Sequence, residues 1–155
     1  MRIQQFQVSL VEKTRAQLPR ARQNFKARAF FTLVKIFYAR PKIHYEVWVR
    51  GKEHLIEIGL HCEADKATND ALLVFFHAHG IEIFAELGAR IEIEQWTTAW
   101  SRVHEVVPYE TLDADLVDAL AHKLARMISV LEPMLDAYWK SNGKSKRAPK
   151  SRAQK

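Results

Sequence analysis

Four short segments of this 155-residue chain alternate between apolar and polar side chains, and this alternation constrains the fold more than any other feature. The segments are residues 44–50, 55–63, 90–97 and 102–107. Because successive side chains of a strand point to opposite faces of a sheet, a two-residue period predicts strands with one buried and one polar face. The turn at Gly51 joins the first two segments, so we expect two β-hairpins.

Apolar residues at helical spacing lie before, between and after the two hairpins. Residues 66–88 are apolar on nearly every side, which is typical of a buried helix, although Gly80 could divide it. Residues 112–139 carry an apolar stripe and predict a long helix. Near the N-terminus, residues 9–18 predict a short helix, and residues 20–39 predict a second one.

The order helix, β-hairpin, helix, β-hairpin, helix predicts the α+β class: a two-layer domain on a four-stranded antiparallel sheet. The length suits one domain, which we place at residues 1–140. It would consist of a basic helical segment, 9–39, followed by sheet and helices over 44–139. Residues 141–155 are basic, with none of the larger apolar residues, and we expect this tail to be disordered.

The net charge of +6 is distributed in three blocks along the chain. Residues 13–45 contain nine basic residues and no acid, and residues 140–155 contain seven basic residues and no acid. Between them, residues 46–139 contain 17 acidic and seven basic residues. Such asymmetry indicates that an anionic partner engages the two basic blocks.

We predict that this partner is a nucleic acid or an acidic protein, and that the chain is a non-catalytic binding or accessory protein. The basic helical segment and the tail would make the contact, through Arg15, Arg20, Arg22, Lys26, Arg28, Lys144, Lys146, Arg147, Lys150 and Arg152. Because lysine and arginine neutralise phosphates whatever the base sequence, such binding should weaken steeply as salt rises.

The polar sides of the predicted strands would together form one face of the sheet. Its candidate functional residues are Trp48, Glu57, His61, Glu63, Trp96 and His104. The simplest interpretation is a solvated surface with cross-strand ion pairs, while the tryptophans also suit a homodimer interface. Carboxylates on this face would repel phosphates, so nucleic acid is expected at the basic segments instead. Alternation directs Cys62 into the core, away from His61 and Glu63. It also places Glu105 on the apolar side of its strand, where a bulge or an edge position would accommodate it.

The alternative function is a metal-dependent hydrolase or nuclease in which His61, Glu63 and His104 hold a divalent ion that activates water. It requires the imidazoles of His61 and His104 to lie close enough to share an ion. The sequence contains no HExxH, CxxC or GxSxG motif. We therefore expect no catalytic residue, metal or cofactor.

The only cysteine, Cys62, excludes an internal disulfide, which suits a reducing compartment. The first residues lack the apolar stretch of a signal peptide, and the apolar run at residues 30–38 is too short to cross a bilayer. We therefore expect a cytoplasmic homo-oligomer, most simply a dimer, without a transmembrane segment.

Overall fold

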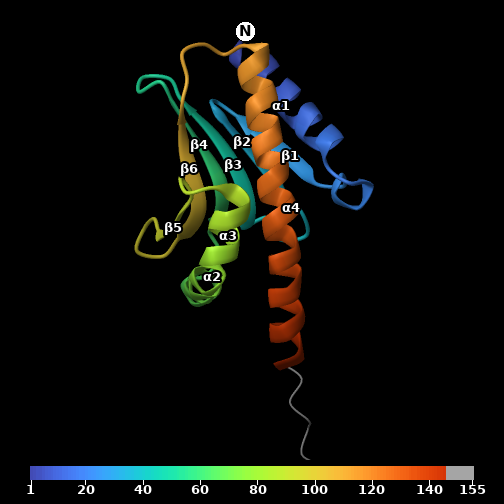
Figure 1. The fold of residues 1–155 in the computed structure, drawn as a ribbon, viewed down its shortest axis with the longest axis vertical. Coiled ribbons are helices and arrows are strands. Elements are labelled where there is room, and N and C mark those ends of the chain that lie inside the picture. Colours follow the sequence, from blue (N-terminus) through green and yellow to red (C-terminus); the bar gives the residue numbers. More distant parts are fainter. Residues whose placement is uncertain (146–155) are drawn as a thin grey trace, which may run out of the picture.

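A computed structural model describes residues 1–145 of the chain, and the side chains of residues 1–142. The elements follow one another as α1 (Ile3–Gln17), η1 (Arg20–Arg22), β1 (Lys26–Phe30), β2 (Leu33–Phe37), β3 (Ile43–Arg50), β4 (Leu55–Cys62), α2 (Lys66–Ala78), α3 (Gly80–Leu87), β5 (Glu92–Gln95), β6 (Ser101–Pro108) and α4 (Ala114–Ser145). Figure 1 shows their arrangement, with α4 as the longest element.

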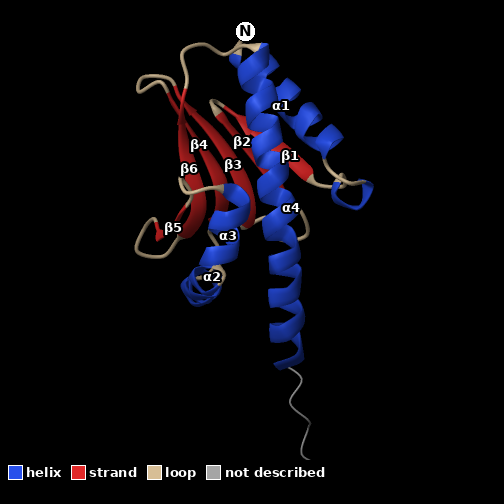
Figure 2. Cartoon of the chain, viewed as in Figure 1, coloured by secondary structure: helices blue, strands red, loops and turns tan. Residues whose placement is uncertain are grey.

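The six strands form one antiparallel sheet in the order β1-β2-β3-β4-β6-β5. Only the β4–β6 pairing joins strands that do not follow each other in sequence. In Figure 2, α4 crosses the sheet and α1 lies along α4. The two short helices α2 and α3 lie on the other side of α4, near its middle. The predicted α+β class with an antiparallel sheet is confirmed, while the predicted number of strands, four, is wrong.

The additional strands come from residues 20–39, for which the prediction of a helix is wrong. They form the hairpin β1–β2, whose second strand pairs with β3 so that Val34 opposes Val47 and Ile36 opposes Tyr45. Burial of Val34 and Ile36 against β3 outweighs the local helical spacing, since β-branched residues pack well in a sheet. The tight turn contains Phe31 with φ +50°, where glycine or asparagine would normally signal a turn.

The other predicted helices are present with different bounds. The short helix expected at 9–18 is part of α1, which begins at Ile3. The segment 66–88 divides at Gly80, as the glycine suggested, into α2 and α3. The last helix, α4, extends to Ser145, into the segment expected to be disordered; residues 146–155 of that tail lie outside the described residues.

The hydrophobic core lies between the helices and one face of the sheet. From α1, Phe6 and Leu10 are fully buried, as are Leu120 and Leu124 of α4 and Ile56 of β4. Burying such side chains is the main favourable contribution to folding. None of the helices among residues 1–145 combines the length and apolar character needed to cross a lipid bilayer.

Two polar or reactive side chains also enter this core. Burial raises the pKa of the Cys62 thiol to about 12, so Cys62 is an inert core residue, as its position in the strand predicted. Glu105 is 3% exposed on the core side of β6, opposite Ile58. Because β5 pairs with β6 only as far as His104, β6 pairs with β4 alone at Glu105, and the Lys123 ammonium of α4 contacts its carboxylate.

Candidate functional site

The face of the sheet opposite the core, here called the outer face, carries most of the polar residues singled out in the sequence. Several are buried although they lie away from the core: His44, Glu46, Glu57, His61 and His104 are each less than a tenth exposed. They bury one another, and Trp96 packs edge-on against the His61 ring at 5.1 Å. The outer face therefore contains an ionic network in place of the solvated surface expected from alternation alone.

Glu57 lies at the middle of this network, between two arginines. Its carboxylate accepts hydrogen bonds from Arg50 at 2.8 Å and from Arg102 at 3.1 Å. The same guanidinium groups lie over tryptophan rings, Arg50 over Trp48 at 5.3 Å and Arg102 over Trp96 at 4.9 Å. The cross-strand ion pairs expected for this face are present, and they neutralise Glu57.

His104 belongs to a cluster at the β5 side of the outer face. Its Nε2 lies 2.8 Å from Glu94 and 3.7 Å from Glu92. Burial and the positive charge of Arg102 lower the pKa of His104 despite its bond to Glu94, so the imidazole is neutral near pH 7. Burial opposes ionisation of Glu94, but hydrogen bonds from Arg102 and His104 outweigh it and hold the Glu94 pKa below its ordinary value.

A second group of side chains, here called the histidine cluster, consists of His44, Glu46, His61 and Glu63. The Glu46 Oε2 atom lies 3.1 Å from His44 Nε2 and 3.2 Å from His61 Nδ1. Glu63 lies 3.8 Å from His44 and 3.6 Å from His61. Lys35 on β2 adds a positive charge, 3.5 Å from Glu63 and 4.0 Å from Glu46. Burial opposes ionisation of Glu63, but the neighbouring His61, His44 and Lys35 hold its pKa below the usual value.

The three residues of the hydrolase alternative are therefore not gathered at one point. Strand pairing places His61 opposite Arg102 and His104 opposite Gly59. Among the described residues, the groups with convergent ligand atoms are His44 with Glu46 and Glu63, and His104 with Glu92 and Glu94. Glu63 belongs to the first of these groups and His104 to the second, while His61 belongs to neither, although its Nδ1 lies 3.2 Å from Glu46.

Two of the predicted anion-binding residues make internal contacts. Arg15 donates to the backbone carbonyls of Gln23 and Phe25, and its guanidinium lies 3.8 Å above the Phe25 ring. Arg22 donates to Asp136 of α4 at 2.7 Å and lies 3.8 Å from the Glu132 carboxylate. These contacts hold the segment before β1 against α1 and α4, so they leave little charge for a partner.

The remaining predicted cations are exposed or outside the described residues. Arg20, Lys26 and Arg28 are exposed, and they form no ion pair with any carboxylate whose side chain the structure describes. The backbone of Lys144 lies in α4. The last predicted residues, Lys146, Arg147, Lys150 and Arg152, lie outside the described part of the chain.

The structure adds Arg40, Lys42 and Lys140 to the exposed cations, which we did not single out from the sequence. Arg40 and Lys42 lie in the connection from β2 to β3, which passes beside the C-terminal half of α4 (Figure 1). There the Arg40 guanidinium lies 3.9 Å from the centre of the Trp139 ring, next to Lys140. The sequence shows that Arg40 and Lys42 belong to one acid-free block and Lys140 to the other. Only the fold shows that the two blocks meet.

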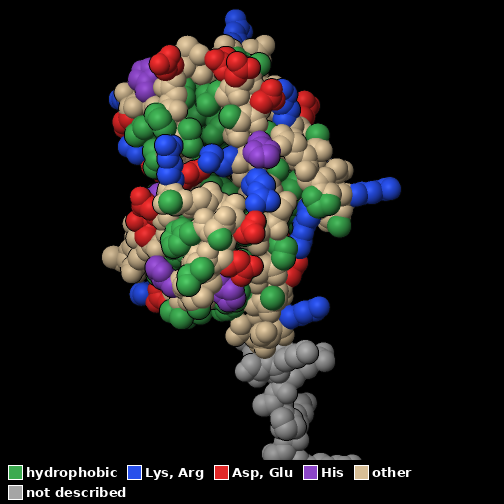
Figure 3. Space-filling view, viewed as in Figure 1, with side chains coloured by type: hydrophobic (Ala, Val, Ile, Leu, Met, Phe, Trp, Pro, Cys, Tyr) green, Lys and Arg blue, Asp and Glu red, His purple; other side chains and the backbone are tan. Residues whose placement is uncertain are grey.

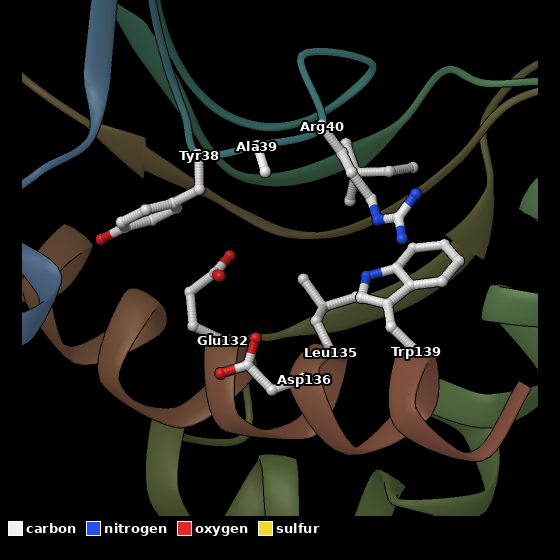
Figure 4. Close-up of a pocket in the computed structure, with 8 residues that line it drawn as sticks. Tyr38, Ala39, Arg40, Glu132, Leu135, Asp136 and Trp139 are labelled. Atoms are coloured by element: carbon white, nitrogen blue, oxygen red, sulfur yellow. The ribbon is translucent and has the colours of Figure 1, made fainter. Parts of the chain in front are cut away.

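Between this connection and α4 lies a small pocket of about 80 Å³. Figure 4 shows Arg40 above Trp139 at one end, and Glu132 pointing toward Tyr38 at the other. Tyr45 donates to Glu132 at 3.1 Å, and burial of Glu132 raises its pKa. Burial and the nearby Glu132 raise the pKa of Tyr38 to about 12, so its hydroxyl stays protonated and donates to the Arg22 carbonyl. At this end of the pocket, the carboxylates of Glu132 and Asp136 are thus already bound by Tyr45 and Arg22.

Comparisons with protein-family models, with curated proteins and with solved structures found no match for this chain.

Proposed function

We propose that this protein binds nucleic acid without sequence preference, through a set of exposed cations here called the basic end: Lys26, Arg40, Lys42 and Lys140. The observation that supports the proposal most is that Arg40 and Lys42, from the connection between β2 and β3, lie beside Trp139 at the end of α4, next to Lys140 in sequence. The acid-free residues 141–155 follow directly from there. Figure 3 shows a Lys or Arg side chain standing clear of the body beside the lower end of α4.

Strand register places Lys26 across from the end of β2, just before the connection that carries Arg40 and Lys42. Lys26, the first residue of β1, pairs with Phe37, the last residue of β2. The connection with Arg40 and Lys42 follows immediately and brings Arg40 onto Trp139, beside Lys140. None of these four cations forms an ion pair with a carboxylate whose side chain is described, so their charge is available to a partner.

Nucleic acid suits the basic end better than an acidic protein for two reasons. First, closely placed lysines and arginines release condensed counterions from a phosphate backbone, which is a favourable contribution to binding. Second, the Arg40 guanidinium over Trp139 offers a planar cation on which an unpaired base can stack. Glu132 and Asp136 lie against Arg22, so they oppose a phosphate only weakly, and Asp65 is the acid that lines a pocket with Arg40 and Lys42.

The expected salt dependence can be worked from the number of cations. If the four cations of the basic end each contact one phosphate of a single strand, log Kobs should fall with log salt with a slope of about −3. The tail adds Lys144, Lys146, Arg147, Lys150, Arg152 and Lys155. With all of these engaged, the slope would approach about −7.

The experiment is fluorescence anisotropy with labelled single-stranded DNA and RNA and with duplex DNA, over a salt series. The full chain is compared with a chain ending at Lys140 and with the variant Lys26→Gln/Lys42→Gln. The matched control is Lys52→Gln/Arg90→Gln, which removes two exposed cations elsewhere. We expect the test variant to reduce the slope by about 1.4 and truncation to reduce it further, while the control leaves it unchanged.

Three results would count against the proposal. Absence of binding at low salt by the full chain would refute it outright. An equal effect of the test and control variants would show that only net charge matters. Binding of polyglutamate in preference to every nucleic acid would identify an acidic protein as the partner instead.

The hydrolase alternative has less support, because His61 and His104 lie in separate clusters and an arginine already occupies Glu94. A dimer through the tryptophans of the outer face also has less support. The Trp48 and Trp96 rings are already in contact with Arg50 and Arg102, which reduces the apolar surface they offer to a second copy.

A further inference from the structure

We propose that the histidine cluster (His44, Glu46, His61 and Glu63) is a binding site for a divalent transition metal, with Zn²⁺ as the ion it suits best. The site is on the outer face, next to the connection that carries Arg40 and Lys42, because the His44 ring contacts the Pro41 carbonyl at 2.9 Å and the Glu63 N–H donates to the Lys42 carbonyl. The inference concerns metal binding and does not depend on nucleic-acid binding. It follows from the register of two strands, the distances between ligand atoms and one buried nitrogen without a hydrogen bond.

Strand pairing brings the four side chains together. His44 on β3 and His61 on β4 are directly opposite, with their rings nearly parallel at 13° and their centres 6.0 Å apart. Glu46 and Glu63 each follow a histidine by two residues, so all four side chains emerge on the same face. One imidazole and one carboxylate thus come from each side of the hairpin.

The distances between these atoms match those around a tetrahedral zinc ion. Zinc binds imidazole nitrogen and carboxylate oxygen at roughly 2.0–2.1 Å, so neighbouring ligand atoms of a tetrahedron are about 3.3 Å apart. The four nitrogen–oxygen distances in the cluster are 3.1, 3.2, 3.6 and 3.8 Å, with Glu63 facing His61 through Oε1 and His44 through Oε2. The ligand atoms of His44, Glu46 and Glu63 lie within 4.8 Å of one another, and His61, whose Nδ1 lies 3.2 Å from Glu46, would join them by a side-chain rotation.

The buried nitrogen is the second, independent indication of a ligand. His61 is 4% exposed, and its Nδ1 atom has no hydrogen-bond partner among the described residues. It faces the carboxylates of Glu46 and Glu63. A buried polar atom without a partner destabilises the fold, and most such atoms in native proteins have one. A metal ion coordinated by Nδ1 would supply the missing interaction.

The charge of the cluster also favours a cation. Two carboxylates, Glu46 and Glu63, face the two imidazoles at 3.1–3.8 Å. Lys35 balances part of this charge, but its ammonium lies 3.5 Å and 4.0 Å from the two carboxylates and makes no hydrogen bond to them among the described residues. Because its stem is flexible and its side chain partly exposed, Lys35 can withdraw when an ion enters.

The cluster around His104 also contains a buried nitrogen without a hydrogen bond, His104 Nδ1, but its carboxylates are less available to an ion. Glu94 accepts two hydrogen bonds from Arg102, at 2.9 Å and 2.8 Å, so its ligand oxygen is already occupied. Glu92 is 65% exposed at the side chain and free to face solvent. His104 therefore provides a control position on the same face of the same sheet.

The donor set indicates which ion to test. Two imidazoles and two carboxylates suit Zn²⁺, whereas Mg²⁺ prefers oxygen ligands and retains several waters. We therefore expect zinc to bind and millimolar magnesium to leave that binding unchanged. Cobalt, which accepts the same geometry, adds a spectroscopic test because its tetrahedral complexes absorb strongly in the visible range.

The experiment is calorimetric titration of the full chain with zinc chloride, and titration with cobalt chloride followed by absorption. The test variants are His61→Asn and Glu63→Gln, which are close in shape to the native residues. The controls are His104→Asn and the exposed His122→Gln, and circular dichroism verifies that each variant is folded. We expect one zinc per chain, with Kd raised at least about tenfold in both test variants and unchanged in both controls.

Lys35→Met provides a separate test, because removal of the competing ammonium should tighten zinc binding. A chain without saturable zinc binding, or with binding unchanged by both test variants, would overturn the proposal. Weaker zinc binding in Lys35→Met would also contradict it. None of these results depends on whether the protein binds nucleic acid, so failure of one proposal is distinguishable from failure of the other.

Discussion

Glu105 carries a negative charge into the hydrophobic core, and its only cationic neighbour in the described part of the chain is Lys123. Replacing Lys123 with methionine would leave this carboxylate buried beside Ile58 without a counter-charge. Breaking a fully buried ion pair costs about 3–5 kcal/mol, since one charge stays desolvated. Because Lys123 is 35% exposed and water already reaches its ammonium, we expect a smaller loss, about 2–3 kcal/mol.

Urea unfolding followed by circular dichroism measures this loss, and calorimetry should show a fall in Tm of roughly 4–12 °C. The double variant Glu105→Leu/Lys123→Met should recover most of it, since an apolar pair of similar volume replaces the ion pair without a buried charge. The two single changes should therefore be strongly non-additive.

The matched control is Lys13→Met, which removes another lysine paired across to α4, with Asp118. Both partners there are about half exposed, so we expect a loss below about 0.5 kcal/mol. A loss in Lys123→Met as small as in Lys13→Met, or a double variant no more stable than Lys123→Met, would refute the reasoning.

Two further predictions concern the outer face. A Cβ atom added at Gly59 would lie within 2.5 Å of His104 Cα, and backbone atoms cannot move aside. Gly59→Ala should therefore lower the free energy of unfolding in urea by about 3 kcal/mol. For the control Gly51→Ala, where the nearest atom to an added Cβ is 3.9 Å away, the loss should be less than about 1 kcal/mol. Since the folded-state pKa of Glu94 is depressed, its ionised form adds stability that is present above the unfolded pKa of about 4.3 and lost as pH falls through the folded pKa. The stability difference between the native chain and Glu94→Gln should thus be largest near pH 7 and disappear toward pH 3; a difference that stays constant would contradict this.

The central strands could be predicted from the sequence because their alternation is strict and their turn contains a glycine. Val47 and Ile58 point to the core and Trp48 and Glu57 point outward, as the two-residue period requires. Helix α4 could be predicted for a similar reason, since its apolar stripe is long. Local pattern was sufficient in both cases because burial and local preference agree.

The hairpin β1–β2 could not be predicted because local pattern and tertiary structure disagree there. Phe25, Phe30, Leu33 and Phe37 are at helical spacing, and the turn at Phe31 has no residue that normally marks a turn. Only pairing with β3 makes the strand conformation favourable. The same error affected the candidate site, because the basic residues of this segment were expected on a helix face.

The histidine cluster shows a second limit of sequence reasoning. His61 and Glu63 could be placed on the outer face from alternation, but the choice of His104 as their partner assumed a strand order that the sequence does not contain. The structure places His44 opposite His61 instead. His44 lies on the same face of its strand as Trp48, as alternation requires, yet nothing local distinguishes it from other polar residues there.

The packing of α1 on α4 has a consequence for the synthesis of the chain. Phe6 and Leu10 are fully buried in the finished protein, but α4, against which α1 packs, begins only at Ala114. At a translation rate of about 5–20 residues per second, the apolar side of α1 waits on the order of 5–20 s for its partner to leave the ribosome. We therefore expect the nascent chain to depend on chaperones most strongly just before α4 emerges, when its sheet is complete and its first helix still lacks α4.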